Sequence, residues 1–170
     1  VAAARPAGRV ESFEVTVERT APEGAEPMEP IAVPVDVWLP PGYDDGGERY
    51  PTVYVLSAEA RDQGRWIETL DREVGRSVAP VVVVFPNFPR APGLRGALAD
   101  AVVPAIDERY RTVADRAQRA NVGMGWSGYQ AALLSFRHSD LFGVLGVQSL
   151  YLLEDQMGQL QEAIGESEAS

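Results

Sequence analysis

Two unbroken apolar runs constrain the fold of this chain most. Thr52–Leu56 is almost entirely apolar, and Val81–Phe85 contains four consecutive valines. Strict alternation of polar and apolar residues would indicate a strand with one solvent-exposed face. Continuous β-branched runs are instead typical of strands that are covered on both faces. The segment between the two runs has apolar residues at helical spacing, and Gly75 is a plausible helix end. These patterns predict a mostly parallel sheet between layers of helices.

The remaining patterns complete a single α/β domain. Val10–Glu18 and Ile31–Leu39 are expected to form an antiparallel pair, with the second strand at an edge because Pro34 cannot donate to a ladder. Val144–Val147 is expected to be a further buried strand. Further helices are expected after the glycine-rich turn near residue 125 and over 94–110 and 151–164, with an interruption at Pro104. The predicted boundaries are a flexible N-terminus at 1–9, one domain at 10–164 and a flexible tail at 165–170.

Composition excludes several classes of function. The formal net charge is −10 and no basic stripe is present, so a nucleic-acid partner is not expected. The chain has no cysteine and one histidine, which argues against thiolate or histidine-rich metal sites, and no metal or cofactor is predicted. No apolar run reaches the roughly 18 residues of a membrane span. The small residues of Val1–Gly8 fit the remainder of a cleaved signal peptide, which favours a secreted or envelope location, and fit a disordered terminus equally well.

The most informative motif joins a short strand to a helix through a glycine-dense turn. Arg119–Gly128 contains this turn, and Arg137–Gly143 follows it at the end of the helix. Val37–Tyr43, Tyr50–Leu56 and Pro104–Thr112 are three further blocks of the same pattern. Together these blocks resemble the esterase D and enterochelin-esterase-like α/β-hydrolases, relatives of the mycolyltransferases, over roughly residues 30 to 150. The resemblance implies a three-layer α/β-hydrolase fold, shortened at its C-terminal side.

The turn differs from the family pattern at the position of the nucleophilic serine. The family turn reads Gly-x-Ser-x-Gly-Gly and presents a nucleophilic serine at a strained apex. Here Gly123 and Gly128 match flanking glycines, Gly125 falls on the serine, and Ser127 falls on the first closing glycine. Glycine has no side-chain oxygen, so nucleophilic catalysis at position 125 is excluded. Ser127 is the alternative nucleophile, but its place favours a first-turn helix residue.

Two further departures concern the oxyanion hole and the general base. The family usually carries His-Gly after its first parallel strand, where a backbone N–H completes the oxyanion hole. Ser57–Ala60 replaces it, and the acidic Glu59 would oppose an oxyanion. His138 is expected to be a helix-terminal residue rather than a general base. The chain also stops before the family's catalytic aspartate and histidine strands, so no triad can be assembled from it.

Other candidate sites carry weaker signals. The carboxylates Asp36, Glu59, Asp62, Asp71 and Glu73 have no spacing that separates them from a solvated surface. The spacing of Gly123, Gly125 and Gly128 formally matches a dinucleotide fingerprint, but in the context of the hydrolase turn. Four residues are predicted to line a remnant binding cleft: Ser57, Glu59, Trp126 and Tyr129.

The sequence therefore favours a non-catalytic esterase-like protein that acts as a binding or structural accessory subunit. A protein partner, or another copy of the chain, is expected along an exposed edge of the shortened sheet. One alternative is an active carboxylester hydrolase or acyltransferase that uses Ser127 with a base supplied from elsewhere. The other alternative is a carbohydrate- or lipid-binding module.

Overall fold

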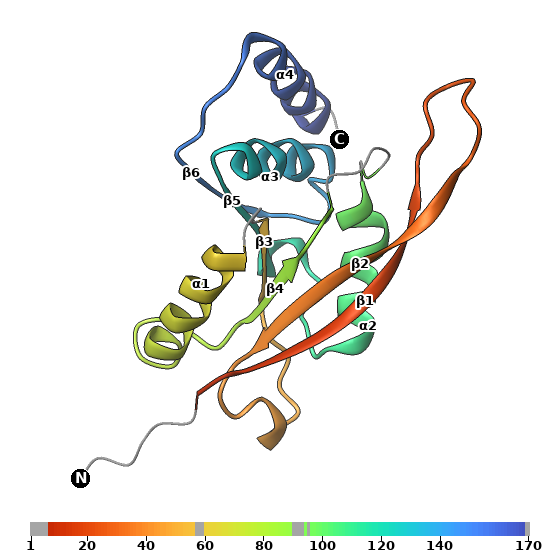
Figure 1. Cartoon of the computed structure of the whole chain (residues 1–170). Coiled ribbons are helices and arrows are strands. Elements are labelled where there is room, and N and C mark those ends of the chain that lie inside the picture. Colours follow the sequence, from red (N-terminus) through yellow and green to blue (C-terminus); the bar gives the residue numbers. More distant parts are fainter. Residues whose placement is uncertain (1–6, 57–59, 90–93, 95, 169–170) are drawn as a thin grey trace.

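The sheet has six strands in the order β1-β2-β4-β3-β5-β6 (Figure 1). The computed structural model describes residues 7–56, 60–89, 94 and 96–168. The strands are β1 (Arg9–Arg19), β2 (Met28–Leu39), β3 (Thr52–Leu56), β4 (Val82–Pro86), β5 (Arg119–Met124) and β6 (Val144–Gln148). The pairs β1/β2 and β2/β4 are antiparallel, and β4, β3, β5 and β6 run parallel. The predicted mixed sheet, with an antiparallel pair first, is confirmed.

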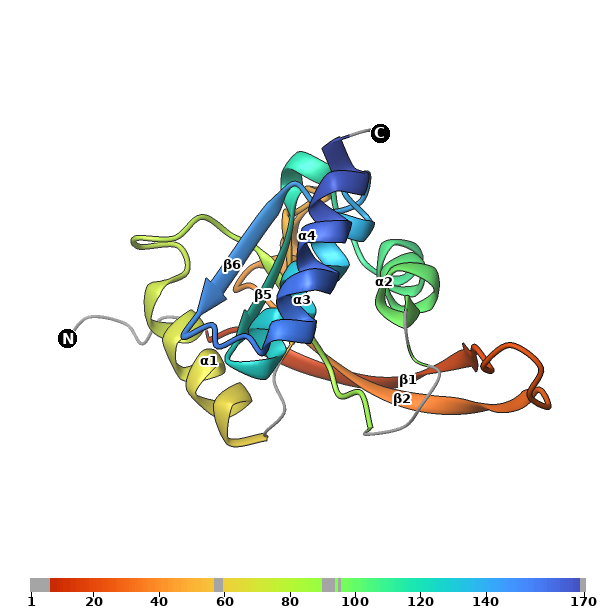
Figure 2. The same ribbon diagram turned by 90° about the horizontal axis from the view of Figure 1, so that it is seen from above.

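Helices cover both faces of the sheet (Figure 2). The helices are α1 (Ala60–Glu73), α2 (Val103–Arg109), α3 (Trp126–Arg137) and α4 (Glu154–Glu168). Short turns of helix are η1 (Tyr43–Asp45), η2 (Leu98–Val102) and η3 (Arg116–Gln118). Helix α1 lies on one face, α2 and α3 lie on the other, and α4 packs on the outside of α3. The right-handed crossovers of a parallel sheet require this arrangement.

The buried runs of the sequence form two cores, one on each side of the sheet. Val83 and Phe85 pack with Leu70 of α1 in one core. Val82 and Val84, which point the other way, pack with residues of η2 and α2 in the second. Because β4 is covered on both faces, all its positions are apolar.

Strand β2 is interior over part of its length, so the edge position predicted from Pro34 is wrong. Val35–Trp38 pairs with β4 on one side and with β1 on the other. Pro34 is tolerated because the β4 ladder ends at the Val35–Pro86 pair, and beyond it β2 pairs only with β1. The Pro34 carbonyl still accepts a hydrogen bond from the Asn87 N–H at 2.9 Å.

The prediction of a buried strand at 144–147 is also wrong. Strand β6 forms where expected, but it is the last strand of the sheet and its side chains are exposed or half-buried. Val144 is 50% exposed. Its composition resembles that of a buried strand because no charged residue interrupts it, while its only neighbour in the described part of the chain is β5.

Two helix boundaries differ from expectation for local reasons. Pro104 lies in the first turn of α2, and the turn before it, η2, is a π-helical turn. Proline has no N–H to donate, so the regular ladder is broken there and the preceding turn widens. Helix α4 continues to Glu168, beyond the expected end at Ile164.

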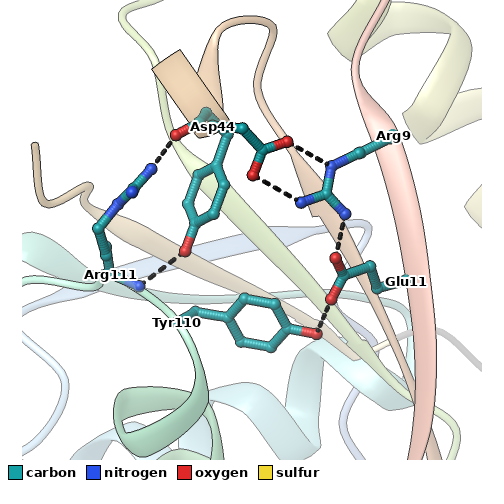
Figure 3. A network of polar contacts seen from close by, with 6 residues as sticks. Arg9, Glu11, Asp44, Tyr110 and Arg111 are labelled. Carbon is teal, nitrogen blue, oxygen red and sulfur yellow. Dashed lines mark hydrogen bonds and ion pairs between the residues drawn. The ribbon is translucent and has the colours of Figure 1, made fainter. Parts of the chain in front are cut away.

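A polar network joins the start of β1 to η1 and to the end of α2 (Figure 3). The guanidinium of Arg9 binds both carboxylate oxygens of Asp44, at 3.0 and 3.1 Å, and also contacts Glu11. The Glu11 carboxylate accepts from the Tyr110 hydroxyl at 3.0 Å. Arg9 holds the pKa of Glu11 below its ordinary value, whereas burial and the Glu11 carboxylate raise the pKa of Tyr110 to about 12. These contacts join β1, η1 and the end of α2, which gives them a structural role.

Candidate functional site at the strand-to-helix turn

Gly125 is the single residue between β5 and α3, and it forms the apex of a sharp turn. Its backbone has φ 56° and ψ −122°, a conformation that residues with a side chain adopt only with strain. Its N–H donates to the Gln148 carbonyl at 2.9 Å, and its carbonyl accepts from the Tyr129 N–H at 3.1 Å. The turn is therefore held by both β6 and the first turn of α3.

The two flanking glycines allow the strand and the helix to approach closely. A Cβ atom on Gly123 would lie 2.2 Å from the Ser127 carbonyl oxygen, which is too close for any side chain. A Cβ atom on Gly128 would lie 3.0 Å from Val147 and 3.1 Å from the Gly123 carbonyl oxygen. At Gly125, in contrast, an added Cβ would have no atom of the described residues within 4 Å. The turn thus has the tight base and open apex of a nucleophile turn, with no side chain at the apex.

Ser127 lies in the first turn of α3, two residues beyond the apex, and is half-buried. The only histidine of the chain, His138, is the C-cap of the same helix. Eleven residues at 1.5 Å each separate the two along the helix axis by about 17 Å. This chain therefore brings no imidazole within hydrogen-bonding distance of Ser127.

A cavity of about 490 Å³ opens beside the turn. Its lining comes from α1, the turn and the carboxyl ends of three parallel strands, the place where open α/β sheets bind ligands. The lining residues are Val55, Leu56, Asp62, Arg65, Trp66, Val122, Gly123, Met124, Trp126, Ser127 and Gln148. Mostly apolar walls with a few polar groups are typical of small-molecule sites.

The structure brings only some of the predicted cleft residues to this cavity. Trp126 and Ser127 line it, and Trp126 is 58% exposed. Tyr129 does not line it, so its predicted place is corrected: the ring is buried between α3 and α4, and its hydroxyl donates to the Gln159 side-chain oxygen at 3.1 Å. The Trp126 and Tyr129 rings are neighbours, with centroids 5.3 Å apart, but the Tyr129 hydroxyl reaches Gln159 of α4. Ser57 and Glu59 lie outside the described residues.

Sequence reasoning missed three cavity residues. Arg65 comes from α1, and Met124 and Gln148 are the last residues of β5 and β6. The positions of Met124 and Gln148 at strand ends could have identified them, since the carboxyl ends of neighbouring parallel strands meet at one edge of the sheet. Met124 and Gln148 are register partners there.

The other carboxylates considered from the sequence have structural partners. Asp36 accepts from Ser12, Gln63 and Asn87. Burial opposes its ionisation, and these hydrogen bonds together hold the pKa of Asp36 below its ordinary value.

Asp71 accepts from the Gly8 N–H and from the Trp38 indole, each at 3.0 Å. Glu73 accepts from Arg72 and Ser77. Within the described ranges, no cluster of three or more His, Cys, Asp or Glu could hold a metal ion.

Comparison with known proteins identifies the family. The family described as "Putative esterase" matches residues 30–167, most of the chain. The chain belongs to this esterase family. In its described part, none of this esterase-family chain's helices has the length and apolarity that crossing a membrane requires.

A curated relative and two solved structures illustrate the likeness. The endo-1,4-beta-xylanase/feruloyl esterase of Xylanibacter ruminicola is 26% identical over 137 residues, an alignment that covers 67% of this chain and 19% of that protein. A serine-to-alanine mutant of the feruloyl esterase module from Clostridium thermocellum, complexed with sinapinate, has a TM-score of 0.69 at 19% identity, covering 95% of this chain and 62% of that one. An IroE-like serine hydrolase from Shewanella oneidensis has a TM-score of 0.65 at 16% identity, covering 93% and 57%.

The comparisons show which fold this chain shares with the solved esterases and how much of the curated relative it spans. At identities below 25% the solved structures show the fold, which is that of α/β-hydrolase-like esterases. The esterase-family chain spans about a fifth of the length of the curated relative.

Proposed function

We propose that this chain is a non-catalytic member of the esterase family that serves as a binding or structural accessory subunit. The observation that carries the proposal is the apex of the turn. Gly125 keeps the strained backbone of a nucleophile position and the open space above it, but offers no oxygen atom for attack.

The surroundings of the turn support the same conclusion. Acyl transfer by a serine needs an imidazole hydrogen-bonded to the nucleophile and oriented by a carboxylate. Ser127 lies on ordinary helical backbone below the apex, and the single histidine lies at the opposite end of α3. An active esterase built on Ser127 would therefore need a base that these 170 residues do not supply.

Ester hydrolysis tests the proposal directly. The relatives are feruloyl esterases by name, so methyl ferulate and p-nitrophenyl acetate are suitable substrates. We expect wild type, Ser127→Ala and Gly125→Ser to match the buffer background, since a serine hydroxyl without a base is a weak nucleophile. Turnover by wild type that disappears in Ser127→Ala would overturn the proposal in favour of an active hydrolase or acyltransferase. Turnover gained by Gly125→Ser would contradict the absence of a base.

The binding surface that we assign to the accessory role is the edge of β6. Val144, Leu145 and Val147 are exposed there although the strand carries no charge. An apolar edge strand with unpaired backbone groups is a template for another chain. The proposed role is docking along this edge.

A second candidate function is small-ligand binding in the cavity, with a carbohydrate or lipid as the ligand class. The observation that favours it is the pair of tryptophans, Trp66 and Trp126, on a mostly apolar wall beside Arg65. Xylo-oligosaccharide and decanoate are the probes, and tryptophan fluorescence is the signal. We expect saturable quenching that is lost in Trp126→Ala and retained in Arg137→Ala, a matched exposed site at the far end of α3. Identical spectra with and without both probes would exclude this function.

A further inference from the structure

We propose that the layer between α3 and the sheet is a binding site for internal water, held by polar side chains of β3, β5 and α3. The inference goes beyond the proposed function, because it uses no residue of the cavity or of the Gly125 apex. It also depends on neither edge of the sheet, since β3 lies between β4 and β5, and β5 lies between β3 and β6.

Five buried polar atoms of this layer have no hydrogen-bond partner in the described part of the chain. They are the hydroxyl oxygens of Thr52, Tyr54 and Ser135, together with Arg119 Nε and Asn121 Oδ1. Each of the five residues is at most 6% exposed. Leaving a buried polar group unpaired costs its desolvation free energy, so nearly all such groups in folded proteins have a partner, either protein or ordered water. Five such atoms in one layer point to a ligand that can pair with them.

Strand register brings four of these residues to the same face of the sheet. In the parallel β3/β5 ladder, Thr52 is the register partner of Arg119. Two positions further along both strands, and therefore on the same face, Tyr54 is the register partner of Asn121. The unpaired atoms are thus side by side on two adjacent strands.

The side chains of Tyr54 and Arg119 both reach the segment that follows α3. The Tyr54 ring lies edge-on to Phe142, with centroids 5.8 Å apart, and the Arg119 guanidinium donates to the Leu141 carbonyl at 3.1 Å. Burial, together with the nearby Asp107 carboxylate, raises the pKa of the Tyr54 hydroxyl. The hydroxyl therefore keeps its proton at neutral pH and can donate a hydrogen bond to a ligand.

Helix α3 covers this face with short side chains. Asn121 Nδ2 donates to the Ala131 carbonyl at 3.2 Å, which places this part of the helix directly over β5. Ser135 lies one helical turn beyond Ala131 and faces the same way. Both residues are buried, and side chains this short leave room for water between the helix and the polar groups of the sheet.

The chemistry of the five atoms favours water over an ion. Arg119 Nε–H can only donate, Asn121 Oδ1 can only accept, and the three hydroxyls can do both. The Arg119 charge is already matched by the Asp107 carboxylate at 2.6 Å, so an added ion of either sign would be buried without a counterion. Water is neutral, and it donates and accepts. Because a buried water makes about three hydrogen bonds, five atoms require about two molecules.

A high-resolution crystal structure tests the site directly. We expect about two ordered waters, each within about 3.2 Å of at least two of the five atoms. Direct pairing of the five atoms with one another, or a layer without ordered water, would overturn the proposal.

Water-to-protein NOE measurements test the site in solution. In the rotating frame, a bound water gives a cross-peak opposite in sign to the peak from proton exchange with bulk water. The Arg119 Nε–H should show the bound-water peak. The Arg19 Nε–H, which donates to the Glu29 carbonyl at an exposed position, is the matched control and should show exchange alone. Exchange alone at Arg119, or no peak there, would contradict a bound water.

Tyr54→Phe distinguishes a hydroxyl that binds water from one that is merely unpaired. Loss of a hydrogen bond to water should lower the folding equilibrium constant about fivefold, whereas removal of an unpaired hydroxyl would relieve its desolvation and raise the constant. Tyr151→Phe is the matched control, because Tyr151 is 75% exposed, and it should leave the constant unchanged. Urea denaturation followed by circular dichroism measures both variants. An increase, or no change, in Tyr54→Phe would overturn the proposal.

Discussion

At the scale of single residues, the glycines of the turn are required for different physical reasons. Gly123 is required by space, because the Ser127 carbonyl occupies the volume of any side chain. Gly125 is favoured by its backbone angles, since its surroundings are open. A single sequence motif thus combines a packing requirement with a conformational one.

Gly123→Ala should destabilise the fold by about 2 to 4 kcal/mol, because the backbone of α3 must move to admit the methyl group. Urea denaturation followed by circular dichroism measures the change. Gly158→Ala is the control: at this position on α4, no atom in the described part of the chain lies within 4 Å of an added Cβ. There alanine should add about 0.5 to 1 kcal/mol through helix propensity. A loss at position 123 of less than 1 kcal/mol would contradict the close approach.

A buried ion pair joins β5 to α2. The Arg119 side chain is 3% exposed, and its guanidinium lies 2.6 Å from the Asp107 carboxylate. Asp107 also accepts from the Thr112 hydroxyl at 2.6 Å, and Arg119 donates to the Leu141 carbonyl at 3.1 Å. The charge of Arg119 is therefore compensated at the site where the chain enters β5.

Asp107→Ala should cost about 3 to 5 kcal/mol, because it leaves the buried guanidinium without its counterion. The measurement is the free energy of unfolding in urea at neutral pH. Asp115→Ala, which removes an exposed cap of η3, provides the comparison and should cost about 1 kcal/mol. Similar losses of unfolding free energy in both variants would show that removing the Asp107 carboxylate does not leave a costly uncompensated charge on Arg119.

At the scale of elements, Asp36 connects four segments that are distant in sequence. It lies on β2 and accepts from Ser12 on β1, Gln63 on α1 and Asn87 after β4. Burial raises the pKa of Asp36, but the three hydrogen bonds favour the ionised carboxylate and together lower its pKa in the folded state.

Asp36→Asn should reduce stability at neutral pH and change its dependence on pH. A depressed folded-state pKa contributes stability that is present above the unfolded value of 3.8 and is lost as pH falls through the folded value. Urea denaturation between neutral pH and about pH 3 should therefore show the two proteins converging in acid. A constant difference across this range would contradict an ionised Asp36.

At the scale of the whole molecule, the two edges of the sheet have opposite character. β1 is charged and belongs to a long hairpin that extends from the body, whereas β6 is uncharged (Figure 1). The formal net charge of −10 repels like copies and keeps them apart at low salt. Any association of two copies therefore works against this repulsion.

Added NaCl should strengthen the association of two copies, because screening weakens their mutual repulsion. Between about 50 and 500 mM NaCl, where the Debye length falls from roughly 14 to 4 Å, the dimer fraction should rise at a fixed protein concentration. Sedimentation velocity measures it. A dimer that dissociates as salt is added would instead indicate pairing of opposite charges.

The elements and the family could be predicted from the sequence because their signals are local. Continuous valine runs such as Val81–Val84 require cover on both faces. The glycines at 123, 125 and 128, between a short strand and a helical segment, indicate the turn. The substitution at Gly125 and the single histidine are likewise visible without coordinates. Each of these inferences depends on the chemistry of a residue or on the periodicity of its neighbours.

The neighbours of each element were decided only by the tertiary structure. Val144–Val147 has the composition of a buried strand, but the sheet order puts it last among the described strands. Pro34 suggests an edge strand, but β2 lies between β1 and β4, and Pro34 lies just beyond the β4 ladder. Tyr129 turns to α4 and away from the cavity, while Met124 and Gln148 enter it by register. The sequence by itself determined the strands, the helices and the glycine at position 125, because these depend on local chemistry. Exposure, cavity lining and the order of the strands depend on contacts between distant segments, which only the folded sheet brings together.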